Sequence, residues 1–352
     1  MGLRHPKAVS LYRVRLPGWL VAVLVVFFAL VLRGVAAGQS DLSPDDLALY
    51  ERRSYGVDLP DWYGRHPYFL TWSLGDGQAF VTMAADLNLD GAVTGLANPV
   101  YRYSRVGFSW LGRALALGQT DWIPLGLFAV NVIALAALAV RLAAMQDRYG
   151  MGPLLGLLNP ALYIAFATDT AELLGVTLAV WAMTSPPGRS ARWLAAGLGA
   201  TRPELSTALA ASAAGISLWI PAGVVVVLMR VVGVLALGTE GSVASGGSLS
   251  WPLMGYVEAW RRSRLPVALG SAGLLLAAAV TIYLGLRRYE GGARLAWVAS
   301  GSLLLILSPL VLLRPANYLR AAAALPLLWS TGQTARSHQT ARLQKRRISS
   351  ST

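Results

Sequence analysis

Apolar residues in this chain occur in long uninterrupted blocks, separated by stretches that hold most of its charge. The alternation of polar and apolar residues that is typical of a membrane β-barrel does not recur. An α-helix needs about 20 apolar residues to cross the hydrocarbon core of a bilayer. The pattern therefore predicts an all-α, polytopic helical membrane protein. We expect about ten transmembrane helices, at residues 18–37, 122–143, 152–167, 173–184, 193–200, 205–219, 221–238, 265–286, 294–313 and 317–331.

These helices divide the chain into five segments. They are a basic tail at 1–17, a first transmembrane helix at 18–37, a long loop at 38–121, a helix bundle at 122–331 and a second basic tail at 332–352, which we expect to be disordered. A basic stretch before an apolar run is also typical of a signal peptide. Because many spans follow and the run is long enough to cross a bilayer, a retained first helix is the favoured interpretation.

The distribution of charge predicts the orientation. The net charge is +13, and its arginines and lysines gather in both tails and in short loops, whereas residues 38–76 are rich in aspartate. Loops with an excess of positive charge stay in the cytoplasm. We therefore expect a multi-pass protein of the cell membrane, with both termini cytoplasmic and residues 38–121 outside. The basic tails then face anionic lipid, and nucleic acid is not an expected partner.

The long outer loop has the composition of a folded cap. It is rich in Trp, Tyr and Phe, which argues against disorder and is typical of a membrane interface. Residues 78–87 and 106–117 read as short interfacial helices on either side of a turn at residues 95–99. The expected architecture is therefore a helix bundle under an outer cap of amphipathic helices.

The composition also limits the chemistry. The chain has no cysteine and three histidines, so neither a thiolate nor a histidine metal site is expected. Catalysis would depend on carboxylates and arginines. Carboxylates can hold a divalent cation together with phosphates, and the sequence leaves the need for such a cation undecided.

Candidate site residues gather at the predicted outer ends of the helices. Each ionisable side chain within a span costs about 2.5 kcal/mol or more on insertion scales, so a cluster of them usually lines a polar cavity. Arginines bind the oxygens of a lipid phosphate, and a carboxylate accepts a proton from an attacking hydroxyl. The cluster comprises Asp76, Arg102, Arg105, Asp169, Glu172, Arg202, Glu204, Arg314 and Arg320.

Several of these residues have a structural interpretation of equal standing. Asp76 is as well placed to cap a helix that begins near Gly77 as to act in catalysis. Arg102 and Arg105 have the pattern of interfacial arginines whose side chains reach lipid headgroups, which is the more common role of such residues.

The acids of the bundle have a similar alternative. Asp169 and Glu172 can pair with Arg202 and so hold helices together, and for Glu172 this is at least as good an interpretation as catalysis. Glu204 can form a local turn with Arg202. The segments around Asp169 and Glu204 also fit re-entrant hairpins in place of full spans.

Four short motifs resemble those of a known family. They read Gly75-Asp76-Gly77-Gln78-Ala79-Phe80, Tyr101-Arg102-Tyr103-Ser104-Arg105, Asp169-Thr170-Ala171-Glu172 and Thr201-Arg202-Pro203-Glu204. With these motifs, residues 15–330 resemble bacterial integral membrane proteins related to the GT-C glycosyltransferases, whose relatives include mannosyltransferases.

The resemblance implies an enzyme that transfers a sugar, with inversion, from a polyprenyl-phosphate donor to a cell-envelope acceptor on the outer face. Asp76 would be the general base. Gln78, Arg102, Arg105 and Arg202 would bind the lipid phosphate, and Asp169, Glu172 and Glu204 would support the site.

Two other classes of function fit the sequence. One is a transporter or flippase for a lipid-linked anionic substrate, which would place its charged groups near the middle of the bilayer. The other is a non-catalytic partner in an envelope-synthesis complex. The depth of the charged residues therefore separates the enzyme from the transporter.

Overall fold

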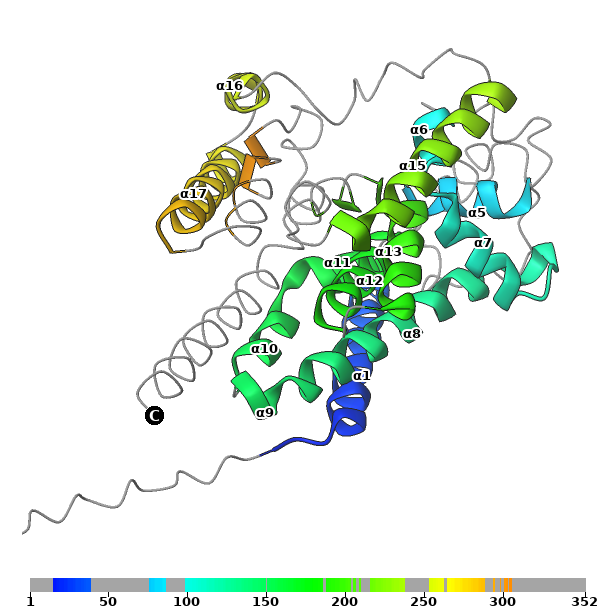
Figure 1. The fold of residues 1–352 in the computed structure, drawn as a ribbon, viewed down its shortest axis with the longest axis horizontal. Coiled ribbons are helices and arrows are strands. Elements are labelled where there is room, and N and C mark those ends of the chain that lie inside the picture. The colour runs from blue at the N-terminus through cyan, green and yellow to red at the C-terminus, as the bar shows by residue number, and fades with distance from the viewer. Residues whose placement is uncertain are drawn as a thin grey trace, which may run out of the picture.

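A computed structural model of the protein describes residues 15–38, 76–86, 99–149, 151–185, 188–203, 216–237, 253–262 and 265–288, together with residues 205, 206, 209, 294, 298, 301, 302, 304 and 305. Within these residues all regular secondary structure is helical, which confirms the predicted all-α class (Figure 1). The predicted spans at 205–219, 294–313 and 317–331 lie largely or wholly outside the described residues.

Three of the described helices are long and apolar enough to cross a membrane. They are α1 (Gly18–Gly38), α8 (Ile123–Ala144) and α15 (Ile216–Leu237). Two shorter apolar helices, α12 (Glu172–Thr184) and the central part of α17 (Leu265–Arg288), resemble them in composition. The predicted helices at 18–37, 122–143, 173–184 and 265–286 thus have counterparts with nearly the same bounds.

Helices α1 and α8 pack side by side in opposite directions. A Cβ atom on Gly18, at the start of α1, would lie 3.6 Å from Val140, near the end of α8. Just beyond these ends, the side-chain Nε2 of Gln146 donates to the carbonyl oxygen of Leu16 at 3.2 Å. Contact with α8 buries one side of α1, whereas Phe27, on another side, is 63% exposed.

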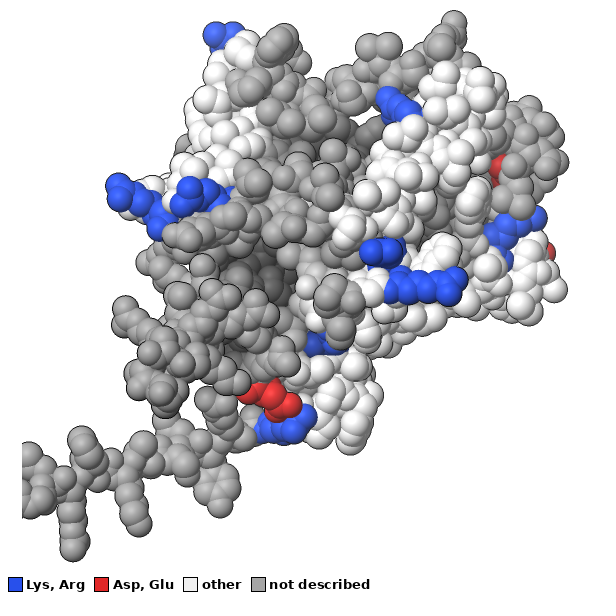
Figure 2. Space-filling model, in the orientation of Figure 1, with Lys and Arg blue, Asp and Glu red and all other residues white. Residues whose placement is uncertain are grey.

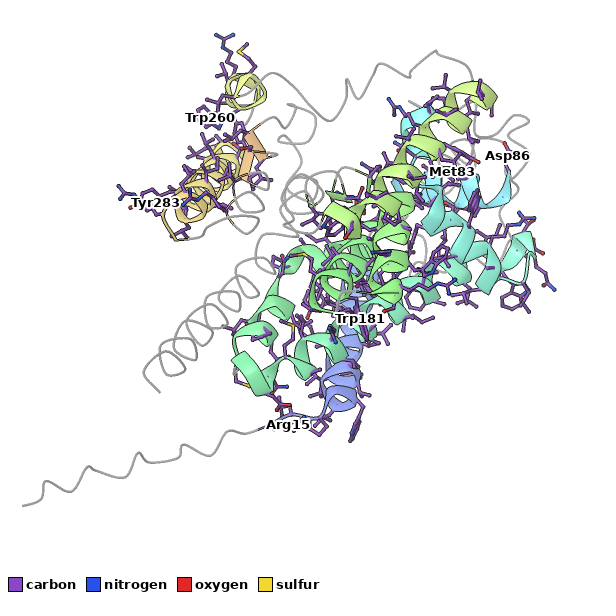
Figure 3. All side chains as sticks on the ribbon, viewed as in Figure 1. Arg15, Met83, Asp86, Trp181, Trp260 and Tyr283 are labelled. Atoms are coloured by element: carbon purple, nitrogen blue, oxygen red, sulfur yellow. The ribbon has the colours of Figure 1, made fainter. Side chains whose placement is uncertain are left out.

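Helix α12 runs alongside α8 in the same direction as α8. Their contacts advance together along both helices, with hydrogen bonds from Thr177 Oγ1 to Ala134 O at 3.0 Å, from Trp181 Nε1 to Ala137 O at 3.0 Å and from Arg141 Nε to Thr184 Oγ1 at 2.7 Å. Trp181 belongs to this contact between α12 and α8 (Figure 3). Position along α8 is therefore a common scale of depth for α1 and α12.

Helix α13 (Arg189–Thr201) returns antiparallel to α12. A Cβ on Gly197 would lie 3.5 Å from Leu178, and one on Gly175, at the other end of the pair, would collide with the side chain of Arg202. The backbones approach closely at these glycines. Helix α15 packs on α13 in the same way, since a Cβ on Gly199 would lie 2.6 Å from the carbonyl oxygen of Ala222.

Two predicted boundaries were wrong, both because of a proline. The predicted helix 152–167 is broken into α10 (Gly152–Leu155), a 3₁₀ turn η2 (Gly156–Leu158) and α11 (Pro160–Ala167). Asn159 caps α11 by accepting from the Ala161 amide at 3.1 Å, and Pro160 fits the first helical position because it needs no amide partner there. Conversely, α15 runs unbroken through Pro221, where helices had been expected to separate.

The two helices predicted in the outer loop are present as α5 (Asp76–Ala85) and α7 (Val106–Leu115), joined to the shorter α6 (Pro99–Tyr103). Helix α7 is amphipathic, with Phe108 fully buried and Trp110 43% exposed. In α5, by contrast, every described side chain except that of Ala85 is buried, and Met83 is 2% exposed. Figure 3 marks Met83 on this helix. Helix α5 is therefore part of the core and does not lie at the surface as an interfacial helix.

The chain turns back between α7 and α8 through residues 116–119 and the 3₁₀ turn η1 (Thr120–Trp122). Leu117 and Gly118 have φ of 53° and 77°, so the turn uses left-handed backbone that glycine adopts readily. The two helices cross at Gly112 and Gly126, where a Cβ on Gly126 would collide with the carbonyl oxygen of Gly112.

Helix α16 (Met254–Arg262) packs on α17. Trp260 reaches across to Ser271, with a hydrogen bond of 2.8 Å from the indole nitrogen to the hydroxyl oxygen (Figure 3). The Tyr256 hydroxyl donates to the carbonyl oxygen of Leu304 at 2.9 Å, and burial raises the pKa of Tyr256 to about 12. This tyrosine therefore remains a neutral donor at physiological pH.

Candidate functional site

A buried ion pair joins α1 to the turn between α11 and α12. Arg33 binds the Asp169 carboxylate with both terminal nitrogens, Nη1 to Oδ1 and Nη2 to Oδ2, each at 2.8 Å. The Arg33 side chain is 0% exposed and that of Asp169 6%. Nη1 also donates to the carbonyl oxygen of Phe166 at 3.2 Å, and the guanidinium lies 4.8 Å from the centre of the Phe128 ring.

This arrangement fits the physical demands of a buried charge. A guanidinium inside an apolar helix bundle is costly unless it is paired and its remaining N–H groups are satisfied. The planar fork of arginine matches a carboxylate in bidentate fashion, which is the strongest form of this pair. Three elements meet around Arg33, since Phe128 lies on α8, Phe166 on α11 and Asp169 in the turn that follows.

The turn that carries Asp169 is itself tightly held. Asp169 has a left-handed backbone with φ of 47°, which is uncommon for residues other than glycine, although aspartate tolerates it better than most. The Thr170 amide donates to the carbonyl oxygen of Ala165 at 3.3 Å. Residues 169 to 172 are all buried. The carboxylate of Asp169 and the start of α12 are therefore fixed relative to each other.

A second ion pair lies three residues further along. Glu172, the first residue of α12, accepts from Arg202 Nη1 at 2.8 Å, and their side chains are 5% and 16% exposed. Arg202 directly follows α13, so this pair ties the adjoining ends of the two helices together.

Both pairs lie at nearly the same depth in the bundle. Arg33 is level with Phe128, five residues after α8 begins at Ile123. Glu172 precedes Thr177 by five residues, and Thr177 contacts Ala134, so Glu172 is level with about residue 129. At 1.5 Å per residue, both pairs lie about 8–9 Å from the Ile123 end of a helix that is about 33 Å long. We call Arg33, Asp169, Glu172 and Arg202 the charged layer.

Helices α5 and α7 bring two further motifs toward this layer. They run parallel, with Ser109 Oγ donating to Phe80 O at 2.8 Å and Arg113 Nη1 to Ala84 O at 2.7 Å. One turn back along both helices, this register puts residue 76 level with residue 105. Asp76, the first residue of α5, and Arg105, which immediately precedes α7, are thus at the same end of the pair.

The same end of α7 touches α13. A Cβ on Gly107 would lie 2.9 Å from the Cβ of Ala200, two residues before Arg202. Arg102 and Arg105 are both partly exposed beside this contact. Between them Tyr103 is buried, and burial raises the pKa of its hydroxyl, which stays neutral.

The structure thus places three residues of the predicted cluster, Asp169, Glu172 and Arg202, at nearly one depth, although the sequence did not assign every pair correctly. It contains the Glu172–Arg202 pair that was given as the structural alternative. Asp169, which had been expected to share Arg202, instead binds Arg33. The backbone of Asp76 and Gln78 is described in α5, but their side chains lie outside the described part, as do Glu204, Arg314 and Arg320 in full.

The sequence analysis missed two polar residues, one in the charged layer and one beside it. Arg33 is the single charged residue of α1, which is otherwise apolar. A charge inside a predicted span is itself an indication of a functional or paired residue. Asn131 on α8 is fully buried, and neither atom of its amide has a hydrogen-bond partner among the described residues. It lies one turn from Phe128 and one turn from Ala134, on the part of α8 that faces the layer.

Metal binding has no support in the part of the chain that is described, where no group of three or more acidic or histidine side chains is placed to hold an ion. Comparison of the chain with protein families, with curated proteins and with solved structures finds no match in any of the three. The function must therefore be argued from the site alone.

Proposed function

We propose that the protein is a membrane glycosyltransferase that takes a sugar from a polyprenyl-phosphate donor and attaches it to a cell-envelope acceptor at the predicted outer face. The observation that carries the proposal is the position of the charged layer. It lies about a quarter of the way along α8 from the Ile123 end, on the side that the charge distribution assigns to the exterior.

This depth favours an enzyme over a transporter. A transporter for an anionic lipid would hold its ionisable groups near the bilayer midplane, where access alternates between the two sides. Groups near one end of the bundle suit a substrate whose phosphate stays at the headgroup level while its chain remains in the lipid. The exposed apolar side chains Trp110 and Leu111 of α7, within two turns of Arg105, are consistent with such an amphiphile.

The proposed reaction assigns a task to each motif. The oxygen of the acceptor hydroxyl attacks the anomeric carbon while Asp76 takes the hydroxyl proton. The bond from that carbon to the phosphate oxygen breaks, and the electron pair leaves with the polyprenyl phosphate. Arg102 and Arg105 stabilise the phosphate as its charge increases, with Gln78 as a further donor. Arg202 reaches the same end of α7 and is oriented by Glu172.

The experiment is a transfer assay with the purified full-length protein, polyprenyl-phosphate sugars as donors and an envelope extract as acceptor. We expect wild-type transfer, and a loss of roughly 10²- to 10⁴-fold in Asp76→Asn, the range typical of a general base. Asp86→Asn is the matched control, because Asp86 follows the opposite end of α5 (Figure 3). Full activity in Asp76→Asn would remove the assignment of the base, and no transfer by the wild type would contradict the proposed reaction.

A further inference from the structure

The first turn of α13 presents an unusual surface at the opposite end of the bundle from the charged layer. Arg189, Arg192 and Trp193 are all exposed, and Trp193 is 67% exposed. Their spacing of three and four residues places them on one face of the helix. Ala191 and Ala195, on the other face, are fully buried against the bundle. The exposed face therefore combines two cations with a large amphipathic ring.

The contacts of α12 fix the depth of this face. Thr184, the last residue of α12, is level with Arg141, three residues before α8 ends at Ala144. Because α13 runs antiparallel to α12 with Gly197 opposite Leu178, residues 189–193 are level with the last turn of α12 and the link that follows it. If α8 crosses a membrane, this face lies where the hydrocarbon core meets the headgroups.

The other described arginines at this end are already engaged. Arg15 pairs with Asp147 at 3.0 Å, and Arg141 donates to Thr184 and lies 5.0 Å from the centre of the Trp181 ring. Figure 2 shows basic and acidic atoms side by side at the lower end of the molecule, where α1 begins in Figure 1. By contrast, no described carboxylate lies within ion-pair distance of Arg189 or Arg192, and the first turn of α13 has no acidic residue.

We propose that this face of α13 binds the headgroup of an anionic phospholipid. The guanidinium groups of Arg189 and Arg192 hold the phosphate. Trp193 lies in the interfacial region, where its apolar ring contacts the lipid and its N–H reaches the polar layer. Charge complementarity selects an anionic over a zwitterionic lipid, because two cations with no acidic partner among the described residues face the same headgroup. The inference is independent of the proposed reaction.

The test is native mass spectrometry of the full-length protein in mild detergent, titrated with phosphatidylglycerol or phosphatidylcholine of equal chain length. We expect tighter binding of phosphatidylglycerol to the wild type. The Arg189→Gln/Arg192→Gln variant should bind phosphatidylglycerol roughly 30-fold more weakly at its tightest site, which is the combined effect of removing two interfacial cations. The Arg189→Lys/Arg192→Lys variant should retain most of it, which excludes loss of folding as the cause.

The control variant is Arg261→Gln/Arg287→Gln, which removes two exposed arginines from α16 and α17. It should bind phosphatidylglycerol like the wild type. Unchanged binding in the α13 variant, equal losses in both double variants, or equal affinity for the two lipids would each overturn the proposal. Binding of glycerol phosphate as tightly as the intact lipid would also overturn it, because the site would then recognise a soluble anion.

Discussion

At the scale of single residues, Arg33 is the most informative side chain in the structure. It connects the otherwise apolar α1 to the rest of the bundle. Its guanidinium forms a bidentate ion pair with Asp169, donates to a backbone carbonyl oxygen and lies over the ring of Phe128. Burial makes this pair far more consequential than the surface pair of Arg15 and Asp147, whose side chains are 70% and 53% exposed.

We predict that Arg33→Leu or Asp169→Leu alone lowers the free energy of unfolding by about 3–5 kcal/mol, because each leaves one buried charge without its counterion. The double variant Arg33→Leu/Asp169→Leu should recover most of that loss, since no charge then remains in the core. Denaturant unfolding of the purified protein in detergent measures all three variants.

The matched control is Arg15→Leu/Asp147→Leu, which should change the free energy of unfolding by no more than about 1 kcal/mol. Single variants of Arg33 and Asp169 as mild as this control would mean that water reaches the pair. A double variant as unstable as the single ones would show that the pair itself contributes net stability.

At the scale of helices, close approach of the backbones decides the packing. Glycines stand at the contact points of α7 with α8, of α12 with α13 and of α13 with α15, and in each case a Cβ would meet another chain segment. Side-chain packing likewise holds α5 and α7 in their parallel register, since the rings of Phe80 and Phe108 pack edge to face with centres 5.1 Å apart. Asp76 and Arg105 come together through this packing and not through their distance along the sequence.

We predict that Gly126→Ala destabilises the protein by about 1–3 kcal/mol, the usual cost of overpacking, because the new methyl group would collide with the Gly112 carbonyl. Gly223→Ala is the control. It lies inside α15 with open space where the Cβ would be, so a gain of roughly 0.5–1 kcal/mol from helix propensity is expected. Thermal unfolding compares the two, and equal effects would contradict the close crossing of α7 and α8.

At the scale of the whole molecule, the antiparallel pair of α1 and α8 predicts that the two ends of α8 lie on opposite sides of a membrane. The chain has no native cysteine, so single cysteines are clean reporters. In intact cells a membrane-impermeant maleimide should label Gln119→Cys, at the exposed turn before α8, but should label Asp147→Cys only after permeabilisation. Labelling of both from the same side would contradict a transmembrane α8.

The sequence alone predicted the helical class and the bounds of α1, α8, α12 and α17. These follow from local properties, since apolar length, proline and capping residues act within a few turns. It placed Asp169, Glu172 and Arg202 in one cluster because helices that alternate in direction bring alternate ends together. Pro221 was the exception among these local signals. Whether a proline interrupts a helix depends on what replaces the backbone hydrogen bond that the proline cannot form.

Which charges pair is specified only by the packing of the helices. Arg33 and Asp169 are separated by 136 positions, and no local pattern specifies that an arginine of the first helix, rather than Arg202, should bind that carboxylate. The burial of α5 and its parallel register with α7 are equally non-local. Pairing depends on the depth and rotation of helices relative to one another, which the close contacts at glycine and the few buried hydrogen bonds fix only once the chain has packed.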